Sequence, residues 1–169
     1  MSQRVVIDSV AFAREGGLLQ GKLPVGDLAR TLDMLAGSEG DLVYRVEGRL
    51  GPRDRPQLLL EIDGGLSVRC QRCLDGIDYP VRIRGVLELV GNEEELTQEE
   101  IEDDSKDFLT AQKELDVMAL IEDEIILDLP VAPRHESCAL PDAGRWLERV
   151  PPEGTSPFSI LKGLRGKAR

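Results

Sequence analysis

The sequence predicts an α+β fold: an antiparallel β-sheet meander packed against one long helix, with an acidic loop and a short C-terminal helical tail. Two observations support this prediction. Three consecutive segments alternate apolar and polar residues, as strands with one buried face do, and short turn-rich links join them. They span residues 42–50, 58–70 and 79–90. After them, apolar residues recur at the spacings of three and four that a helix buries. These residues are Leu115, Met118, Ile121, Ile125 and Leu129.

The chain before the meander predicts one more strand and a short helix. We expect the strand over residues 4–12, RVVIDSVAF. The helix is expected over residues 27–35, because Asp27 is a common N-cap residue type and Gly37 provides a stop. Within the meander, the Gly64-Gly65 pair interrupts the second strand and predicts a bulge or a bend.

An acidic segment and the long helix follow the meander. Residues 91–113 are acidic and weakly patterned, which predicts a loop with a helical turn near residues 97–101. The helix should cover residues 115–129 and end before Pro130, since proline cannot continue a helix. A strand over residues 125–127 is the alternative, but the periodicity of the whole segment favours a helix.

The C-terminal segment differs in composition, so we assign residues 1–150 to a single domain, with the acidic loop inserted, and residues 151–169 to a Pro/Gly-rich linker and a basic amphipathic tail. Ser156 followed by Pro157 is a helix-start signal. Apolar residues spaced three apart then form a candidate partner-docking face: Phe158, Leu161 and Leu164. The last eight residues contain four bases and no acid, and these bases are Lys162, Arg165, Lys167 and Arg169.

The net charge of −11 is concentrated in one part of the chain. Residues 93–128 carry 15 acidic and 2 basic side chains, whereas the rest of the chain is slightly basic. A face for RNA is therefore compatible with the low isoelectric point, since phosphate attraction depends on local charge. The acidic segment has two interpretations: a solvated loop that keeps the protein soluble, or a docking surface for basic partners.

The composition argues against several classes of protein. No apolar run approaches the roughly 18 residues that span a bilayer, and the N-terminus lacks a secretory signal, so we expect a cytoplasmic protein. Three cysteines argue against a disulfide framework. His135 is the only histidine, which limits general acid–base chemistry, and no Walker loop, G-x-G-x-x-G motif or nucleophile elbow is present. We therefore expect a binding protein rather than an enzyme.

The cysteines and the histidine form two pairs with the spacing of metal ligands. Cys70 and Cys73 make a C-x2-C pair at a hairpin turn, and His135 and Cys138 make an H-x2-C pair after the long helix. Two-residue spacing lets both side chains of a pair reach one tetrahedral ion, so the four residues are candidate ligands of a structural zinc. Reduced structural cysteines and a redox dithiol are the alternatives.

Two charged groups are further candidates. Arg69, Arg72, Arg82 and Arg84 flank the C-x2-C pair and could contact phosphate as nucleic-acid ligands; the alternative is a solvated sheet face in which they pair with acids. The carboxylates of Glu122, Asp123, Glu124 and Asp128 could hold a divalent ion for hydrolysis. Consecutive helical residues point in different directions, however, which favours a solvated helix face.

Four segments of the chain, taken in order, resemble the YceD family of bacterial large ribosomal RNA subunit accumulation proteins. These are VRCQRCL (68–74), the acidic spacer with IEDEIILDLPVAP (121–133), the His135/Cys138 pair, and SPFSIL (156–161). The resemblance implies a role in synthesis, processing or stability of 23S ribosomal RNA and no established catalytic residues. The family pattern has Asn where this chain has Ser156, a small departure because both residue types cap helices.

The resemblance and the residues together predict a non-enzymatic ribosome-biogenesis factor. It would bind pre-ribosomal RNA or a large-subunit ribosomal protein, with no certain cofactor beyond the candidate zinc. Two alternatives are a metal-dependent RNA hydrolase that uses the helix carboxylates and a thiol redox factor that uses the C-x2-C pair.

Overall fold

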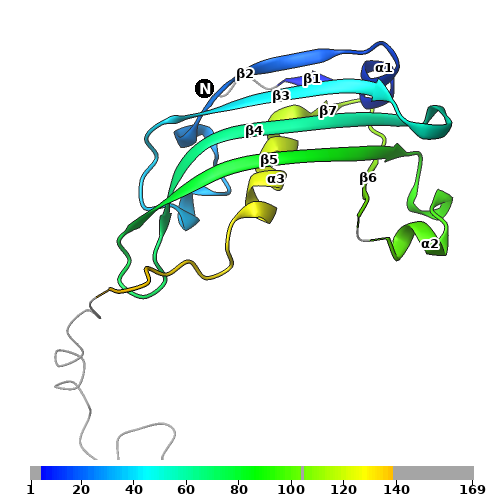
Figure 1. The fold of residues 1–169 in the computed structure, drawn as a ribbon. Helices are drawn as coiled ribbons and strands as arrows, with labels where there is room; N and C mark the ends of the chain where they lie inside the picture. The colour runs from blue at the N-terminus through cyan, green and yellow to red at the C-terminus, as the bar shows by residue number, and fades with distance from the viewer. Residues whose placement is uncertain (1–4, 104, 139–169) are drawn as a thin grey trace, which may run out of the picture. The chain divides into compact units, whose positions relative to one another are not determined.

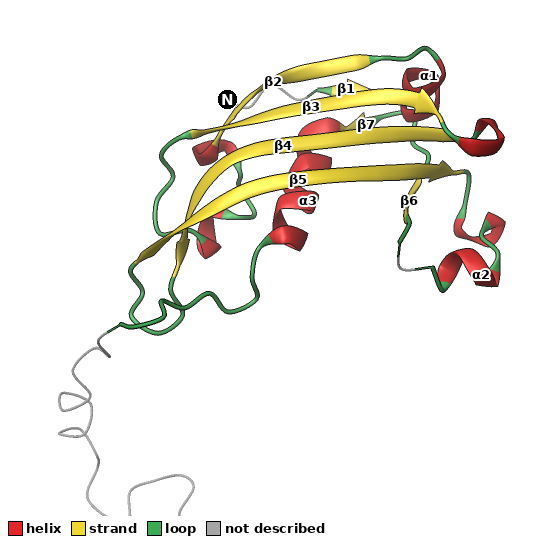
Figure 2. Cartoon of the chain, in the orientation of Figure 1, coloured by secondary structure: helices red, strands yellow, loops and turns green. Residues whose placement is uncertain are grey.

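The computed structural model describes residues 5–103 and 105–138. Contacts divide the chain after His135, so the fold below is that of the unit ending there, and residues 136–138 are the described part of the second unit. The first unit is an α+β domain in which a twisted five-stranded sheet carries the helix α3 (Val117–Asp128) across one face (Figures 1 and 2). Within the described ranges no helix has the length and apolar character needed to span a membrane.

The sheet has the strand order β2-β3-β4-β5-β6. Its strands are β2 (Leu18–Pro24), β3 (Asp41–Leu50), β4 (Pro56–Arg69), β5 (Gly76–Val90) and β6 (Asp107–Thr110). The first four pair antiparallel in a meander, and the alternating pattern predicted three of them, β3, β4 and β5. β6 departs from the prediction because it pairs with β5 in parallel.

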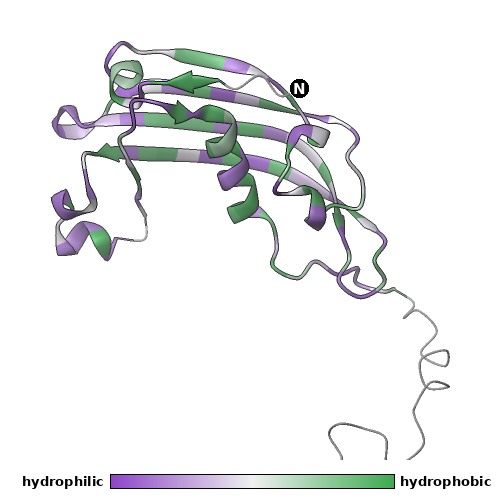
Figure 3. Ribbon diagram, turned by 180° about the vertical axis from the view of Figure 1, so that it is seen from behind, coloured by the Kyte–Doolittle hydropathy of each residue, from purple (hydrophilic) through white to green (hydrophobic). Residues whose placement is uncertain are grey.

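The core lies between the sheet and α3. Leu42, Val46 and Ile62 on the sheet and Ile121 and Ile125 on the helix are completely buried. Seen from the helix side, apolar and polar residues alternate along the strands (Figure 3). This alternation is the pattern that predicted the strands, and it turns one face of the sheet toward the helix.

The helix α3 begins two residues later than predicted. Leu115–Asp116 form the short strand β7, which pairs antiparallel with β1 (Val6–Ile7). The Asp116 carboxylate then caps the helix by accepting from the backbone N–H groups of Met118 at 3.0 Å and Ala119 at 3.3 Å. The helix ends at Asp128, where Leu129 is already extended ahead of the proline, as predicted.

The strand predicted over residues 4–12 is wrong for most of its length. β1 covers Val6–Ile7 alone, and the helix α1 (Ser9–Arg14) follows it. The reason is the side chain of Asp8, which accepts from the backbone N–H of Ala11 at 2.9 Å and so starts a helix.

The helix predicted over residues 27–35 is also wrong. This segment forms two short 3-10 turns, Val25–Asp27 and Leu32–Met34. Between them the backbone N–H groups of Arg30 and Thr31 donate to the Glu122 side chain, so a continuous α-helical ladder does not form there. Strand β2 was not predicted, because exposed Leu18 and the glycine Gly21 obscure its alternation.

The predicted acidic loop over residues 91–113 is partly ordered. A 3-10 turn at Glu93–Glu95 precedes the helix α2 (Gln98–Ile101), which matches the predicted helical turn and begins with a capping box between Thr97 and Glu100.

Another 3-10 turn, Pro52–Asp54, joins β3 to β4. The pairing of β4 with β5 runs in constant register through Gly64-Gly65, so the predicted bulge is absent from this ladder.

Candidate functional site

The candidate metal ligands lie at the tip of the β4–β5 hairpin. In the link between these strands, the Cys70 N–H donates to the carbonyl of Asp75 and the Leu74 N–H donates to the carbonyl of Cys70, both at 2.9 Å. Leu74 has a φ of 69°, a left-handed conformation that is costly for leucine. The result is a tight turn that brings Cys70 and Cys73 close together.

The segment after α3 runs along this hairpin tip (Figure 1). The Gln71 N–H donates to the carbonyl of Pro133 at 2.8 Å, and the Arg72 guanidinium donates to the carbonyl of His135 at 3.3 Å. The His135 ring nitrogen Nε2 lies 3.1 Å from the carbonyl oxygen of Gly76. These contacts set the position of His135 beside the C-x2-C turn.

The four predicted ligands come together. Cys73 Sγ and His135 Nδ1 lie 3.3 Å apart, and the potential ligand atoms of Cys70, Cys73, His135 and Cys138 all lie within 4.8 Å of one another. Cys70 is completely buried, whereas the other three are partly exposed. Three sulfurs and one ring nitrogen at this separation are compatible with a tetrahedral structural zinc site.

The turn also stabilises a negative charge on the Cys70 sulfur. The pKa of this thiol is lowered to about 5, first because the backbone N–H of Cys73 donates to the sulfur and then because the backbone of His135 and Arg72 does the same. Burial opposes this shift without cancelling it. A thiolate is the form that binds metal ions, so the backbone of the turn favours the ligand form of Cys70.

Of the predicted RNA-contacting arginines, Arg82 and Arg84 lie on the sheet face opposite α3 and are exposed, as the alternation predicted. Arg84 pairs with Asp63 at 2.7 Å and more loosely with Glu61 at 3.7 Å. For Arg84 these contacts fit the alternative to phosphate binding, a solvated sheet face on which the arginine pairs with acids. Arg69 differs, because its guanidinium donates to the carbonyl of Leu35 at 2.9 Å.

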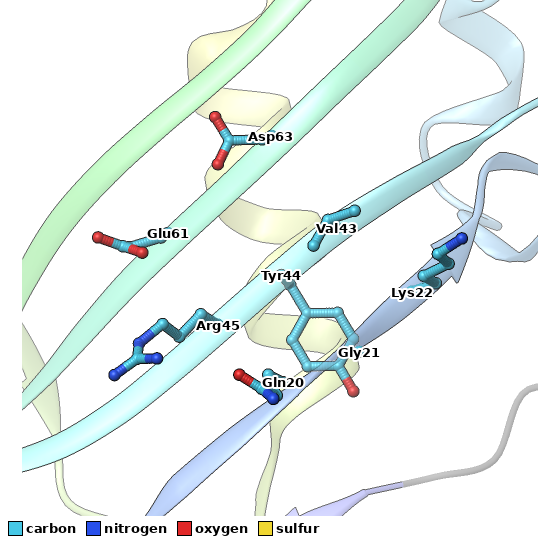
Figure 4. Close-up of a pocket in the computed structure, with 8 residues that line it drawn as sticks. All are labelled: Gln20, Gly21, Lys22, Val43, Tyr44, Arg45, Glu61 and Asp63. Carbon is cyan, nitrogen blue, oxygen red and sulfur yellow. The ribbon is translucent and has the colours of Figure 1, made fainter.

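A hollow of about 480 Å³ along the strands β2, β3 and β4 has mixed charge (Figure 4). Lys22 and Arg45 contribute positive charge, and Glu61 and Asp63 contribute negative charge. Figure 4 shows these side chains spread over neighbouring strands. The hollow therefore lacks the uniform positive potential that attracts phosphate.

The helix carboxylates are neither a metal cluster nor a fully solvated face. Glu122 is only 8% exposed, and it accepts from the backbone N–H of Arg30 at 2.7 Å and from the backbone N–H and hydroxyl of Thr31 at 3.1 Å each. Asp123 pairs with the Arg30 guanidinium at 2.8 Å. In the part of the chain that the structure describes, the cysteine–histidine group alone has metal-ligand geometry.

The structural role of Glu122 was missed by the sequence reasoning. A signal was available, because Glu122 follows Met118 by four residues and precedes Ile125 by three, so it shares their apolar helix face. A charged residue on such a face indicates a buried partner.

The tail candidates, which include Phe158, Leu161, Leu164 and the four terminal bases, lie outside the described residues.

The chain matches the family described as large ribosomal RNA subunit accumulation protein YceD over residues 58–165. The chain belongs to the YceD family. The matched range begins in β4 and includes both ligand pairs and α3. The YceD description concerns the accumulation of ribosomal RNA and specifies no reaction. No solved structure matches the chain.

Proposed function

We propose that this YceD family member is a non-enzymatic ribosome-biogenesis factor that acts in the cytoplasm. It would support the synthesis, processing or stability of 23S ribosomal RNA by binding a component of the assembling large subunit. The family match over residues 58–165 carries this proposal. The use of Glu122 as a hydrogen-bond acceptor for Arg30 and Thr31 counts against a hydrolase that would need this carboxylate for a metal ion.

Charge favours a basic large-subunit ribosomal protein as the partner of the described surface. The segment around α2 exposes several carboxylates: Glu94, Glu95, Glu99, Glu102 and Asp107. Two basic side chains pair nearby, Arg55 with Glu88 and Glu100, and Lys106 with Asp103. The remaining excess of negative charge would attract a basic protein before it reaches the ribosomal RNA, and would steer its approach.

RNA is the second candidate partner, and the composition of the C-terminal segment favours it. Lys162, Arg165, Lys167 and Arg169 stand together without an acid between them. Arg69, Arg72 and Arg82 could add contacts near the hairpin tip, although Arg69 and Arg72 already donate to backbone carbonyls. Binding through these residues would weaken steeply with salt, because each phosphate contact releases counterions.

The test is a pull-down and gradient sedimentation of the tagged full-length chain from cells. The acidic-surface variant is Glu94→Lys, Glu99→Lys and Glu102→Lys; a control with the same charge change is Asp33→Lys, Glu39→Lys and Asp41→Lys, at exposed positions outside this segment. We expect the first variant alone to lose large-subunit proteins. Enrichment of neither ribosomal RNA nor ribosomal proteins by the unaltered chain would contradict the proposal.

A further inference from the structure

The donor atoms at the hairpin tip have the composition of a zinc site. A tetrahedral zinc site has Zn–S bonds of about 2.3 Å and Zn–N bonds of about 2.0–2.1 Å, so its ligand atoms lie about 3.6–3.8 Å apart. Cys73 Sγ and His135 Nδ1 lie 3.3 Å apart, and no pair among the four exceeds 4.8 Å. Movements on the order of 1 Å would therefore complete the tetrahedron.

The hydrogen bonding of His135 selects the ligand nitrogen. The carbonyl oxygen of Gly76 can only accept, so Nε2, which lies 3.1 Å from it, carries the ring proton. The other nitrogen, Nδ1, then has a free lone pair in the neutral ring, and it faces Cys73. Histidines that bind metals commonly donate their second nitrogen to a backbone carbonyl in this way, which fixes the ring orientation.

The position of Cys70 also suits a structural metal ligand. Its side chain is completely buried, and its backbone N–H and carbonyl are both bonded within the turn, to Asp75 and Leu74. These bonds hold the Cys70 sulfur close to the ligand atoms of Cys73 and His135. The left-handed residue Leu74 closes the turn directly after the second cysteine.

We propose that Cys70, Cys73, His135 and Cys138 bind one zinc ion in a closed structural site. Four protein ligands leave no open coordination position, so the ion holds the fold and activates no water. It fastens the extended segment after α3 to the β4–β5 hairpin, and the hydrogen bonds of Gln71 and Arg72 to this segment act beside it. This proposal is independent of the proposed ribosomal role, because metal content and ribosomal association are measured separately.

The first test is metal analysis of the full-length chain, purified in reductant without chelator. We expect about one zinc per chain. Replacement by Co²⁺ should give the intense visible bands of tetrahedral coordination together with a sulfur-to-cobalt charge-transfer band. Metal-free protein, weak octahedral cobalt bands, or a Cys70–Cys73 disulfide found by mass spectrometry would each overturn the proposal.

Single substitutions test the ligand set. Cys73→Ser and His135→Ala should each lose most of the zinc, and Cys138→Ser should lower the charge-transfer intensity. The exposed residue Ser137 lies between the last two ligands, so Ser137→Ala is the matched control and should keep its zinc. Because a ligand variant could fail to fold, the cobalt spectrum of the unaltered chain remains the deciding measurement. An unchanged spectrum in Cys138→Ser would overturn the four-ligand assignment.

Proteolysis tests the fastening of the segment. Arg134 is an exposed trypsin site directly before His135, and Lys113 is an exposed site elsewhere in the domain. Removing zinc with a chelator should speed cleavage after Arg134 several-fold and leave cleavage after Lys113 unchanged. Equal acceleration at both bonds would show general unfolding, and acceleration at neither would show that the ion does not hold the segment; both results would overturn the role assigned to the ion.

Discussion

Replacement of Glu122 by alanine should destabilise the domain strongly. The Glu122 carboxylate accepts from two backbone N–H groups, one hydroxyl and the Arg30 Nε atom, at 2.7–3.2 Å. Thr31 is completely buried, so truncation leaves its hydroxyl without this acceptor and without water, whereas its N–H keeps the carbonyl of Leu28 at 3.1 Å; the Arg30 N–H loses the acceptor as well. Each such loss costs about 1–3 kcal/mol. Since these losses are not additive, we expect a total of about 3–5 kcal/mol, the range found when one partner of a buried pair is removed.

The measurement is equilibrium urea unfolding followed by circular dichroism, with ΔG and the m-value fitted for each variant. Glu122→Gln keeps one carbonyl oxygen as acceptor and should cost less than the alanine variant. The matched control is Asp123→Ala, which removes the neighbouring ion pair with Arg30. Both side chains of that pair are about half exposed, so its loss should cost less than about 1 kcal/mol. If Glu122→Ala costs no more than Asp123→Ala, the buried-anchor interpretation is wrong.

Three further predictions concern single positions. Leu74→Gly should raise the free energy of unfolding, measured in urea, by up to about 1 kcal/mol. Leu74 is exposed and has a left-handed backbone conformation, which glycine adopts without strain; a loss of stability would contradict this. The pKa of the Glu124 carboxyl is raised, first by burial and then by the negative charge of Asp107. Folding therefore favours the protonated carboxyl, so the stabilising contribution of Glu124 is present below the unfolded pKa of about 4.3 and is lost as pH rises through the folded pKa. Glu124→Gln should therefore raise the melting temperature near neutral pH and leave it unchanged in acid, and an equal shift at both pH values would contradict this. Gly48→Ala should destabilise the domain by about 1–3 kcal/mol in the same urea experiment, because the added Cβ would collide with the α1 backbone at Phe12; an unchanged midpoint would show that α1 can move away.

The sequence predicted the elements whose residues repeat regularly. Strands β3, β4 and β5 alternate, and α3 has a clear helical period, so these four elements lie close to the predicted ranges. The cluster of Cys70, Cys73, His135 and Cys138 was also predictable, because the sequence has only three cysteines and one histidine and their spacing within each pair is informative.

The missed features depend on contacts between distant parts of the chain. Strand β6 forms by pairing in parallel with the edge of β5, and no local sequence pattern encodes this pairing. The 3-10 turns near Arg30 depend on a carboxylate of α3 that is far away in sequence. The mixed charge of the outer sheet face likewise follows from the register that sets Arg84 beside Glu61, and this register is not visible in residue counts.

The pairing of β1 with β7 has a consequence for the order in which the chain folds during synthesis. Val6 pairs with Asp116, and the Val117 N–H donates to the carbonyl of Val5, so the N-terminal segment obtains its partners only after α3 begins to emerge from the ribosome. Until then the hairpins β2–β3 and β3–β4 can form, but residues 5–7 lack these partners and the sheet face that α3 covers remains exposed. Such late closure of distant contacts slows folding and lengthens the exposure of apolar surface. We therefore expect nascent chains that stop before residue 117 to be sensitive to protease and to bind chaperones.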